Sequence, residues 1–448
     1  MAKAANRQTG GTSWGRLPGA DQQRLPAPWR PEALPACPPD RPTLLPYGLG
    51  RSYGDSCLNP DGCLLPTTAQ QHLIGFDPGK GLLECEGGVS LDTLLRFLVP
   101  RGWFLPVVPG TKFATVGGAI ANDIHGKNHH GAGTFGCHVR GLELLRSDGS
   151  RRWVAPDSTG PEERDWFSAT VGGLGLTGLI TRAAIQCIPI RSATIRGAVK
   201  KLPDLDAFIA ETALADSRST YTVAWLDCLA GKTTLGRGLW MSGDFGDEAD
   251  GPLKAHRTGG PLRVPVDFPD FVLNRFSIRA FNTFYYHRVP GRSRTLQQHY
   301  KGFFFPLDTI DRWNRIYGRR GFFQYQTVVP FSGGGDALRS MLEEIRQAGE
   351  GSFLGVLKAF GDRPSPGWLS FPQPGYTLAL DFPNRGQSTL ALFERLDAIT
   401  RSAGGRLYPA KDARMPPELF REAYPQLNRF IPFMDPAFGS GFSRRMGL

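Results

Sequence analysis

The chain has 448 residues, of which 40% are hydrophobic and 21% charged, and it carries a formal net charge of +11 at pH 7. This hydrophobic fraction supports a sizeable core and excludes a disordered tail, and the length predicts two or three domains. A basic chain can bind nucleic acid, anionic lipid or a phosphorylated substrate. Its basic residues are spread along the sequence, however, and no nucleic-acid-binding motif is present, so we expect no nucleic acid partner.

The sequence contains no apolar run of about 18 residues, the length that crosses a bilayer. Residues 1–14 also lack the apolar stretch of a secretory signal. These features predict a cytoplasmic protein and leave peripheral contact with the inner membrane open. The 7 cysteines are odd in number and form no CxxC pair, which predicts free thiols and no metal site.

In chain order, prolines recur between Pro26 and Pro46 and exclude a long helix there. Residues 43–190 are glycine-rich, with short leucine-rich and β-branched runs between turn signals that predict strands. Leucines at helical spacing follow Ser90, a good N-cap residue, and predict a helix as far as Val99. This region is therefore expected to be α+β.

Beyond residue 190 the strand-like segments become longer and alternate with helical patterns, which predicts a second domain made of a sheet covered by helices. The predicted strands include 220–226 and 322–329, and the predicted helices are 203–214, 335–348 and 387–403. We place the domains at 10–190 and 191–405, with 406–448 returning to the first domain.

The first of four segments with chemical potential runs from Pro46 to Ser56 and contains three glycines. Glycines let a backbone curl so that successive N–H groups point at one anion. Arg51 would add charge, and the hydroxyls of Ser52 and Ser56 would add donors. A glycine-rich surface turn is the alternative.

The second segment spans residues 109–133, with small residues at 117–119 that permit close approach of a large planar ligand. The tract that follows holds histidines and a lysine, which can supply hydrogen bonds or positive potential. His125 and His129 have the spacing of two metal ligands on one helical face, but Gly126 argues against a regular helix there. An ordinary polar loop is the other alternative.

The third segment, residues 170–180, places glycines among apolar residues and suggests a buried turn against a flat ligand, or else a glycine-rich core hairpin. The fourth, residues 404–414, contains Lys411, which either stabilises charge developing on a bound cofactor or pairs with Asp412 at the surface. Together, the separated segments predict one extended ligand that contacts several loops.

These segments, in this order, resemble the vanillyl-alcohol-oxidase-type FAD-linked oxidases, and most of all the members that oxidise the ribose of a polyprenyl-phosphate sugar. The resemblance extends from Thr12 almost to the C-terminus and is most specific at 48–55 and 116–130. It implies an α+β fold with a two-part FAD-binding domain (10–190) and a substrate domain (191–405) whose antiparallel sheet is covered by helices.

The resemblance also implies FAD bound without a covalent link, because Arg51 and Ser52 stand where many relatives have a flavin-tethering histidine. The residues implied to hold FAD are Tyr47, Gly48, Leu49, Gly50, Arg51, Ser52, Tyr53, Gly54, Ser56, Gly110, Thr115, Val116, Gly117, Gly118, His125, Gly126, Lys127, Asn128, Ile180 and Tyr408. Those implied to lie near the substrate are Lys127, Gln326, Lys358 and Lys411.

The implied reaction transfers hydride from the sugar C2 to FAD and yields a 2-keto sugar, which a separate NAD(P)H-dependent short-chain reductase converts to the epimer. Lys411 is our first choice for the group that takes the hydroxyl proton, with Tyr53 and His125 as alternatives. Two departures from relatives are the proline tract in place of a helix and Ala379 in place of a pocket cysteine.

Residues 271–307 contain basic and aromatic residues but no acidic one, a composition that suits anionic lipid head groups and acyl chains. In the family this segment is a mobile loop, and we expect it to dock a polyprenyl-phosphate tail. Alternatively, its aromatics belong to the core. The alternative function is that of an alditol or aldonolactone oxidase that uses oxygen.

Overall fold

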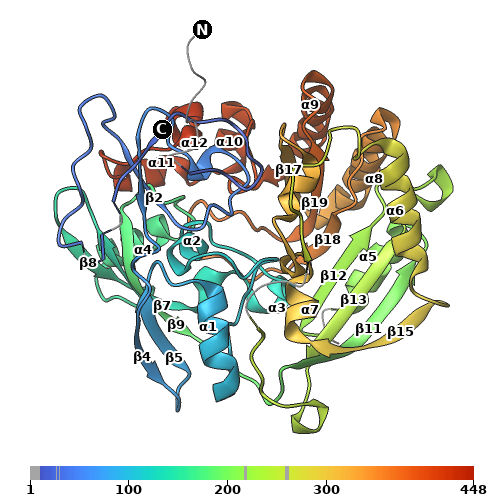
Figure 1. The fold of residues 1–448 in the computed structure, drawn as a ribbon, viewed down its shortest axis with the longest axis horizontal. Coiled ribbons are helices and arrows are strands. Elements are labelled where there is room, and N and C mark those ends of the chain that lie inside the picture. Colours follow the sequence, from blue (N-terminus) through green and yellow to red (C-terminus); the bar gives the residue numbers. More distant parts are fainter. Residues whose placement is uncertain (1–10, 27, 30, 216–218, 258–261) are drawn as a thin grey trace.

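A computed structural model describes residues 11–448 except 27, 30, 216–218 and 258–261. The fold is α+β, as expected, and its strands form three larger sheets (Figure 1). Residues up to Pro189, here called the N-terminal half, build two of these sheets, and residues from Thr194 onward, here called the second half, build the third.

The N-terminal half contains a small parallel sheet and an antiparallel one. The 3-stranded sheet has the order β1 (Gln23–Arg24), β3 (Cys63–Pro66), β2 (Leu44–Tyr47). The 5-stranded sheet has the order β4 (Leu73–Asp77), β5 (Leu82–Glu86), β9 (Leu179–Gln186), β7 (Val139–Leu145), β8 (Arg151–Val154). The helices of this half are α1 (Leu91–Leu98), α2 (Val116–Ala121), α3 (His129–Ala132) and α4 (Pro161–Thr170).

The second half is dominated by an antiparallel 8-stranded sheet, one face of which is covered by α5 (Leu205–Ala215), α8 (Phe331–Ala348) and α9 (Gln387–Ser402) (Figure 1). Its strand order is β15 (Ser293–His299), β11 (Thr194–Leu202), β13 (Gly238–Phe245), β12 (Tyr221–Leu226), β18 (Gly355–Phe360), β19 (Gly375–Pro383), β17 (Phe322–Val329), β20 (Arg406–Leu407). Leu357, Leu378 and Leu380 are buried under these helices.

Most of the elements expected from the sequence are present. The helix after Ser90 is α1, whose N-cap hydroxyl accepts a hydrogen bond from the Thr93 N–H at 3.1 Å. The expected helices at 203–214, 335–348 and 387–403 are α5, α8 and α9, and the expected strands at 220–226 and 322–329 are β12 and β17.

The segment 271–307, which we expected to be a loop, is instead mostly regular. It forms α6 (Arg275–His287), β15 and α7 (Tyr300–Phe304). Asn274 begins α6 because its side chain accepts hydrogen bonds from the N–H groups of Phe276 and Ser277.

The C-terminal segment leaves the large sheet after β20 and runs back over the N-terminal half, where α10 (Pro417–Ala423), α11 (Leu427–Phe430) and α12 (Gly441–Met446) lie near β2 (Figure 1). Arg445 of α12 donates to both oxygens of Asp55, at 2.8 and 2.7 Å, and to Asp412 at 2.8 Å. Both carboxylates are buried. This three-membered ion cluster joins the first glycine-rich segment to the last one.

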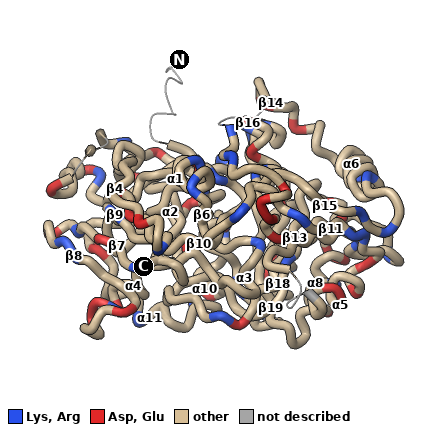
Figure 2. The backbone as a smooth tube through the Cα atoms, turned by 90° about the horizontal axis from the view of Figure 1, so that it is seen from below, with Lys and Arg blue, Asp and Glu red and all other residues tan. Residues whose placement is uncertain are grey.

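Lysines and arginines are distributed over both halves of the backbone (Figure 2). Within the described part of the chain, no helix combines the length and the apolar character needed to cross a bilayer.

Replacing Arg445 with methionine should lower the free energy of unfolding by about 3–5 kcal/mol, because two buried carboxylates lose their ion-pair partner. Thermal unfolding monitored by circular dichroism measures the change. Arg401→Met is the matched control, since Arg401 is 58% exposed and pairs with Glu422 at the surface, where such pairs contribute about 0–1 kcal/mol. Equal losses in the two variants would contradict the role of the cluster.

Candidate active site

All four glycine-bearing segments meet around one cavity of about 380 Å³, a volume within the usual range of small-molecule sites. The cavity lies between the N-terminal half and the eight-stranded sheet. Its wall comes from residues 46–57, 109–125, 174–180, 307–313 and 408–411 and from three strands of the large sheet. Segments that are far apart in sequence therefore share a single ligand-sized space.

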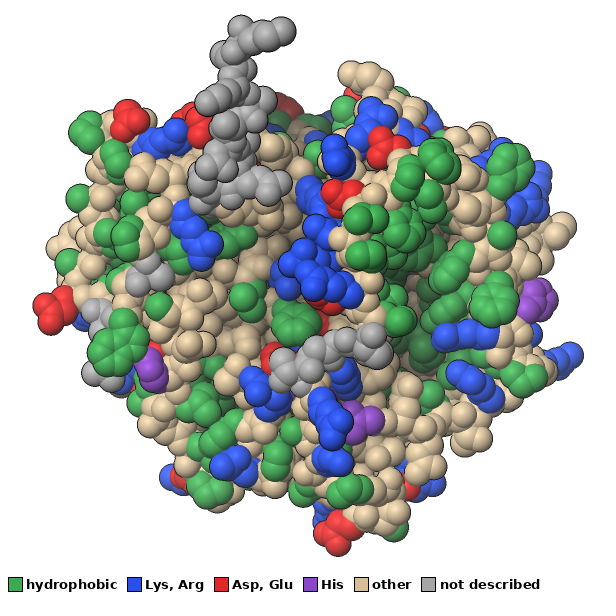
Figure 3. Space-filling view, viewed as in Figure 1, with side chains coloured by type: hydrophobic (Ala, Val, Ile, Leu, Met, Phe, Trp, Pro, Cys, Tyr) green, Lys and Arg blue, Asp and Glu red, His purple; other side chains and the backbone are tan. Residues whose placement is uncertain are grey.

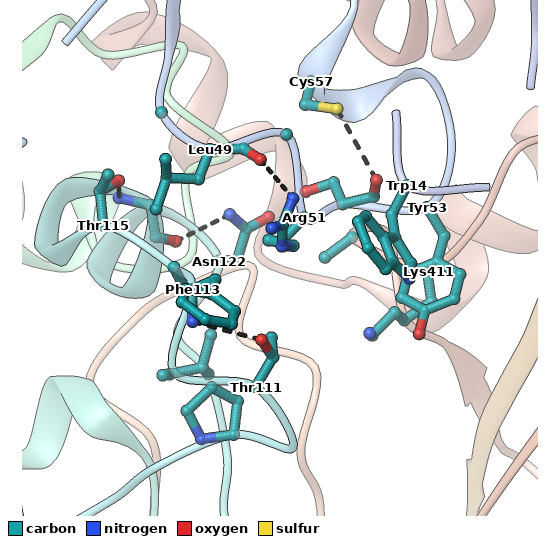
Figure 4. Close-up of a pocket in the computed structure, with 18 of the residues that line it drawn as sticks. Trp14, Leu49, Arg51, Tyr53, Cys57, Thr111, Phe113, Thr115, Asn122 and Lys411 are labelled. Carbon is teal, nitrogen blue, oxygen red and sulfur yellow. Dashed lines mark hydrogen bonds between the residues drawn. The ribbon is translucent and has the colours of Figure 1, made fainter. Parts of the chain in front are cut away.

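The first segment presents a row of free backbone donors to this cavity. None of the N–H groups of residues 48–52 donates a hydrogen bond to another described residue. The Arg51 guanidinium lies 4.3 Å from the centre of the Trp14 ring, on the side of the cavity where Tyr53 and Lys411 also lie (Figure 4). Unpaired N–H groups beside an arginine favour an anion, phosphate above all.

The second segment packs directly against the first. A Cβ atom on Gly48 would lie 2.5 Å from the Thr115 hydroxyl oxygen, and that oxygen caps α2 by accepting the Gly118 N–H at 3.2 Å. At Gly110 and Gly175 a Cβ atom would meet nothing within 4 Å, although both residues line the cavity. The glycines thus serve close packing at one position and leave open space for a ligand at the others.

One face of the large sheet forms the opposite wall of the cavity. Along each of its central strands, alternate residues point to this face. The register pairs Gln324 with Asp381, Gln326 with Ala379, and Ala379 in turn with Val356. The six side chains that line the cavity from β17, β19 and β18 are Gln324, Gln326, Ala379, Asp381, Val356 and Lys358.

The lysines around the cavity share this space without a contacting carboxylate. Among the described residues, no ion pair within 4.0 Å involves Lys358 or Lys411. Burial lowers the pKa of Lys358 to about 8. Burial also lowers the pKa of Lys411, with Asp381 opposing and Lys358 reinforcing the effect. A lysine in this state loses its proton at a lower pH than one in water.

His125 and Tyr53 are both held in their uncharged forms by burial. The Gln326 amide contacts His125 Nε2 at 3.0 Å, while His125 Nδ1 is buried and has no partner in the described chain. Burial and the charge of Lys358 hold the pKa of His125 well below its usual value, so the ring is neutral. Burial raises the pKa of Tyr53 well above 10, so the phenol keeps its proton.

Most of the expected site residues line the cavity, but some lie behind its wall. Lys127 donates to the Phe304 carbonyl at 3.2 Å, Asn128 donates to the Pro106 carbonyl at 2.8 Å, and Tyr47 donates to the Thr12 carbonyl at 2.8 Å. Gly54, Val116 and Gly126 likewise do not line the cavity. Those that do are Gly48, Leu49, Gly50, Arg51, Ser52, Tyr53, Ser56, Gly110, Thr115, Gly117, Gly118, His125, Ile180, Gln326, Lys358, Tyr408 and Lys411.

Three carboxylates line the cavity that are not among the site residues expected from the sequence: Asp308, Asp311 and Asp381. Asp308 accepts hydrogen bonds from the Thr111 hydroxyl and the Lys112 N–H, both at 2.8 Å. Asp381 is 1% exposed and accepts from the Gln324 amide at 2.5 Å. Gln324 and Asp381 could have been found from strand alternation, since each lies two residues from a cavity position that was named. Asp308 offered no comparable signal.

The histidines of the second segment do not form a ligand set. Across the described residues, no group of three or more His, Cys, Asp or Glu side chains is arranged to hold a metal ion. His129 packs against Phe360 with ring centres 4.3 Å apart, and His130 contacts the Ser219 carbonyl at 3.1 Å.

Comparison with known proteins identifies the family to which the chain is similar. Residues 32–155 match a family described as an FAD binding domain. Decaprenylphosphoryl-beta-D-ribose oxidase of Mycolicibacterium smegmatis is 39% identical over 416 residues, which cover 90% of this chain and 88% of the relative. An uncharacterized protein in the mprA 5' region of Streptomyces coelicolor is 35% identical over 80% of this chain and 100% of the relative. Mitochondrial D-2-hydroxyglutarate dehydrogenase of Rattus norvegicus is 29% identical over 29% of this chain and 24% of its own.

The cavity fits the FAD that these comparisons require. The free N–H groups of residues 48–52 suit the cofactor's phosphates, and the open space beside Gly110 and Gly175 suits a flat ring. Two buried polar atoms of cavity-lining residues, Ser56 Oγ and His125 Nδ1, have no protein partner in the described chain and can bond to a ligand. The chain therefore belongs to the vanillyl-alcohol-oxidase-type family of FAD-dependent oxidoreductases acting on CH–OH groups, the family of decaprenylphosphoryl-beta-D-ribose oxidase.

Proposed function

We propose that this protein oxidises the 2-hydroxyl of a polyprenyl-phospho-ribose to a ketone. The product would be the intermediate of an epimerisation that a separate NAD(P)H-dependent short-chain reductase completes. The observation that carries the proposal is 39% identity, along 90% of the chain, to a relative whose name states this type of substrate. A polar cavity wall of glutamines, lysines and a carboxylate supports it, because such groups bond to sugar hydroxyls.

We assign the three- and five-stranded sheets, within 10–190, to the two parts of the FAD-binding domain. The eight-stranded sheet, within 191–405, then belongs to the substrate domain, and 406–448 returns to the first domain. This division is supported by the order of the elements and by the position of the cavity between the two halves.

Bound FAD supplies the hydride acceptor, and the protein's own groups manage the proton. Of the expected proton acceptors, Lys411 is favoured by its environment, since burial lowers its pKa and makes the neutral amine accessible near neutral pH. Tyr53 retains its proton, and His125 already contacts Gln326 through Nε2. Lys411 Nζ lies 3.9 Å from the centre of the Tyr53 ring, which helps to orient it.

We also propose that FAD is held without a covalent bond. Among the described residues that line the cavity, His125 is the only histidine and Cys57 the only cysteine. Burial raises the pKa of Cys57 to about 12, and its sulfur contacts the carbonyls of Ser52 and Gly54. A protonated thiol of this kind is a poor nucleophile for a flavin ring.

We also propose peripheral membrane contact through a surface around α6. Arg275, Arg279 and Arg288 are exposed there, and Figure 3 shows hydrophobic and basic side chains gathered on this side of the molecule. The exposed apolar side chains of this α6 surface are Leu262, Val266, Phe271, Phe276, Phe281 and Phe284, at 61, 64, 76, 83, 42 and 73% exposure.

The α6 surface includes Leu262 of β14 (Leu262–Arg263), and β14 pairs with β16 (Ile310–Asp311). Both residues of β16 line the cavity. By contrast, the aromatics of the same segment from Tyr300 to Phe305 are buried, as the alternative interpretation expected. We propose that the lipid tail of the substrate lies against the exposed side chains of the α6 surface while its sugar occupies the cavity.

The covalency proposal predicts that acid or heat denaturation releases all FAD into the supernatant. Wild-type protein and a Cys57→Ser variant should release FAD to the same extent, because Cys57 does not bind the flavin covalently. Absorbance at the flavin band in pellet and supernatant measures the split. Flavin that stays with the precipitated wild-type chain would contradict the proposal and favour an oxygen-using alditol or aldonolactone oxidase.

Anaerobic addition of polyprenyl-phospho-ribose should bleach the flavin absorbance of the wild-type protein. Lys411→Ala should slow this reduction by about 10²–10⁴-fold, the usual contribution of a general base, while Lys80→Ala, a change at an exposed turn, should not. Because the base must be deprotonated, the wild-type rate should rise with pH through the lowered pKa of Lys411. Full turnover in Lys411→Ala would remove the assigned role.

Wild-type protein should sediment with vesicles that contain anionic lipid and less well with zwitterionic ones. The double variant Phe276→Glu/Phe284→Glu should lose this binding, because it places charge on the α6 surface. Ile74→Glu, at a 47% exposed position of β4 on the other half, is the matched control. Undiminished binding of the double variant would rule out α6 as the contact.

A further inference from the structure

Asp381 is a buried carboxylate whose charge is not balanced by a contacting cation. It is 1% exposed and lines the cavity from β19. It takes part in no ion pair within 4.0 Å among the residues that the structure describes. Burying an unpaired carboxylate is costly, so such a group is a candidate for contact with a ligand.

Gln324 fixes the orientation of this carboxylate. The two residues are directly opposite each other on β17 and β19, and the Gln324 amide donates to Asp381 Oδ1 at 2.5 Å. The Asp381 N–H donates in turn to the Ser352 hydroxyl at 3.1 Å, which anchors the strand. Asp381 Oδ2 has no hydrogen bond to another described residue. The site therefore offers one oriented acceptor oxygen to whatever occupies the cavity.

The groups around Asp381 limit what that occupant can be. Lys411 is the cation that interacts with it through space, and the phenols of Tyr53 and Tyr317 are the other titratable neighbours. Burial raises the pKa of Asp381, and the Gln324 hydrogen bond and Lys411 oppose this effect. Whether ionised or protonated, the carboxyl can bond to a hydroxyl, whereas an ionised one repels a phosphate.

We propose that Asp381, oriented by Gln324, determines specificity by accepting a hydrogen bond from the sugar hydroxyl next to the one that is oxidised. The inference rests on the proposed function and adds the residue that selects the sugar. Asp381 also orients the substrate. The ionised carboxylate repels the phosphate, so the sugar ring can bind at Asp381 only with its phosphate directed away. A site that binds a hydroxyl in this way discriminates strongly against analogues that lack it.

The test compares polyprenyl-phospho-ribose with its 3-deoxy analogue, which retains the reacting 2-hydroxyl. Wild-type protein should show a kcat/KM about 10- to 100-fold lower for the analogue, the value of one hydrogen bond to a charged group. Asp381→Ala should lower kcat/KM for the parent to about the level of wild type with the analogue. The variant should then treat both substrates alike, as a double-mutant cycle requires of a direct contact.

Asp308→Ala is the matched control, because that cavity carboxylate is already engaged by Thr111 and Lys112. It should keep the wild-type ratio between the two substrates. FAD content and circular dichroism establish that each variant is folded, and Asp381→Asn, which retains an acceptor oxygen, should preserve part of the discrimination.

Two results overturn the inference. One is an Asp381→Ala variant that keeps the wild-type ratio. The other is an equal collapse of kcat on both substrates with a lost pH dependence, which would make Asp381 the proton acceptor instead. A wild-type protein that is not reduced by the parent substrate would refute the proposed function itself, and the two failures are thus distinguishable.

Discussion

The cavity depends on a backbone contact that only glycine permits. A Cβ atom on Gly54 would lie 1.8 Å from the Asp412 carbonyl oxygen, so the first glycine-rich segment and the C-terminal segment can touch only because this side chain is absent. The Tyr53 N–H donates to the Ala410 carbonyl at 2.9 Å beside it. Lys411 is carried in this way to the ring of Tyr53, more than 350 positions away in the chain.

The same cavity concentrates charge that the protein does not neutralise by itself. Lys358, Lys411 and Asp381 all line it, and no two of them are within ion-pair distance. Proteins bury such groups at a cost in stability, and groups with strongly shifted pKa values gather where a ligand or a reaction uses them. The energetic cost here is consistent with a site shaped for FAD and a polar substrate.

The second half of the chain has two separate roles that follow from strand alternation and from surface exposure. Alternate residues of β17, β18 and β19 face the cavity, and the intervening ones are buried under α8 and α9. Away from this sheet face, α6 leaves large aromatics exposed beside arginines. This part of the chain thus combines a polar wall of the cavity with exposed apolar side chains on α6.

Local patterns in the sequence predicted most of the elements and one extended ligand, and the family resemblance identified that ligand as FAD. Leucine spacing after Ser90 predicted α1, and the glycine-rich segments predicted one extended ligand, since both signals depend on neighbouring residues alone. The tertiary structure decided which side chains reach that ligand. Lys127 lies behind the wall at the Phe304 carbonyl, whereas Asp381 and Gln324 meet across two strands. Register and long-range packing set these positions, and no local pattern encodes them.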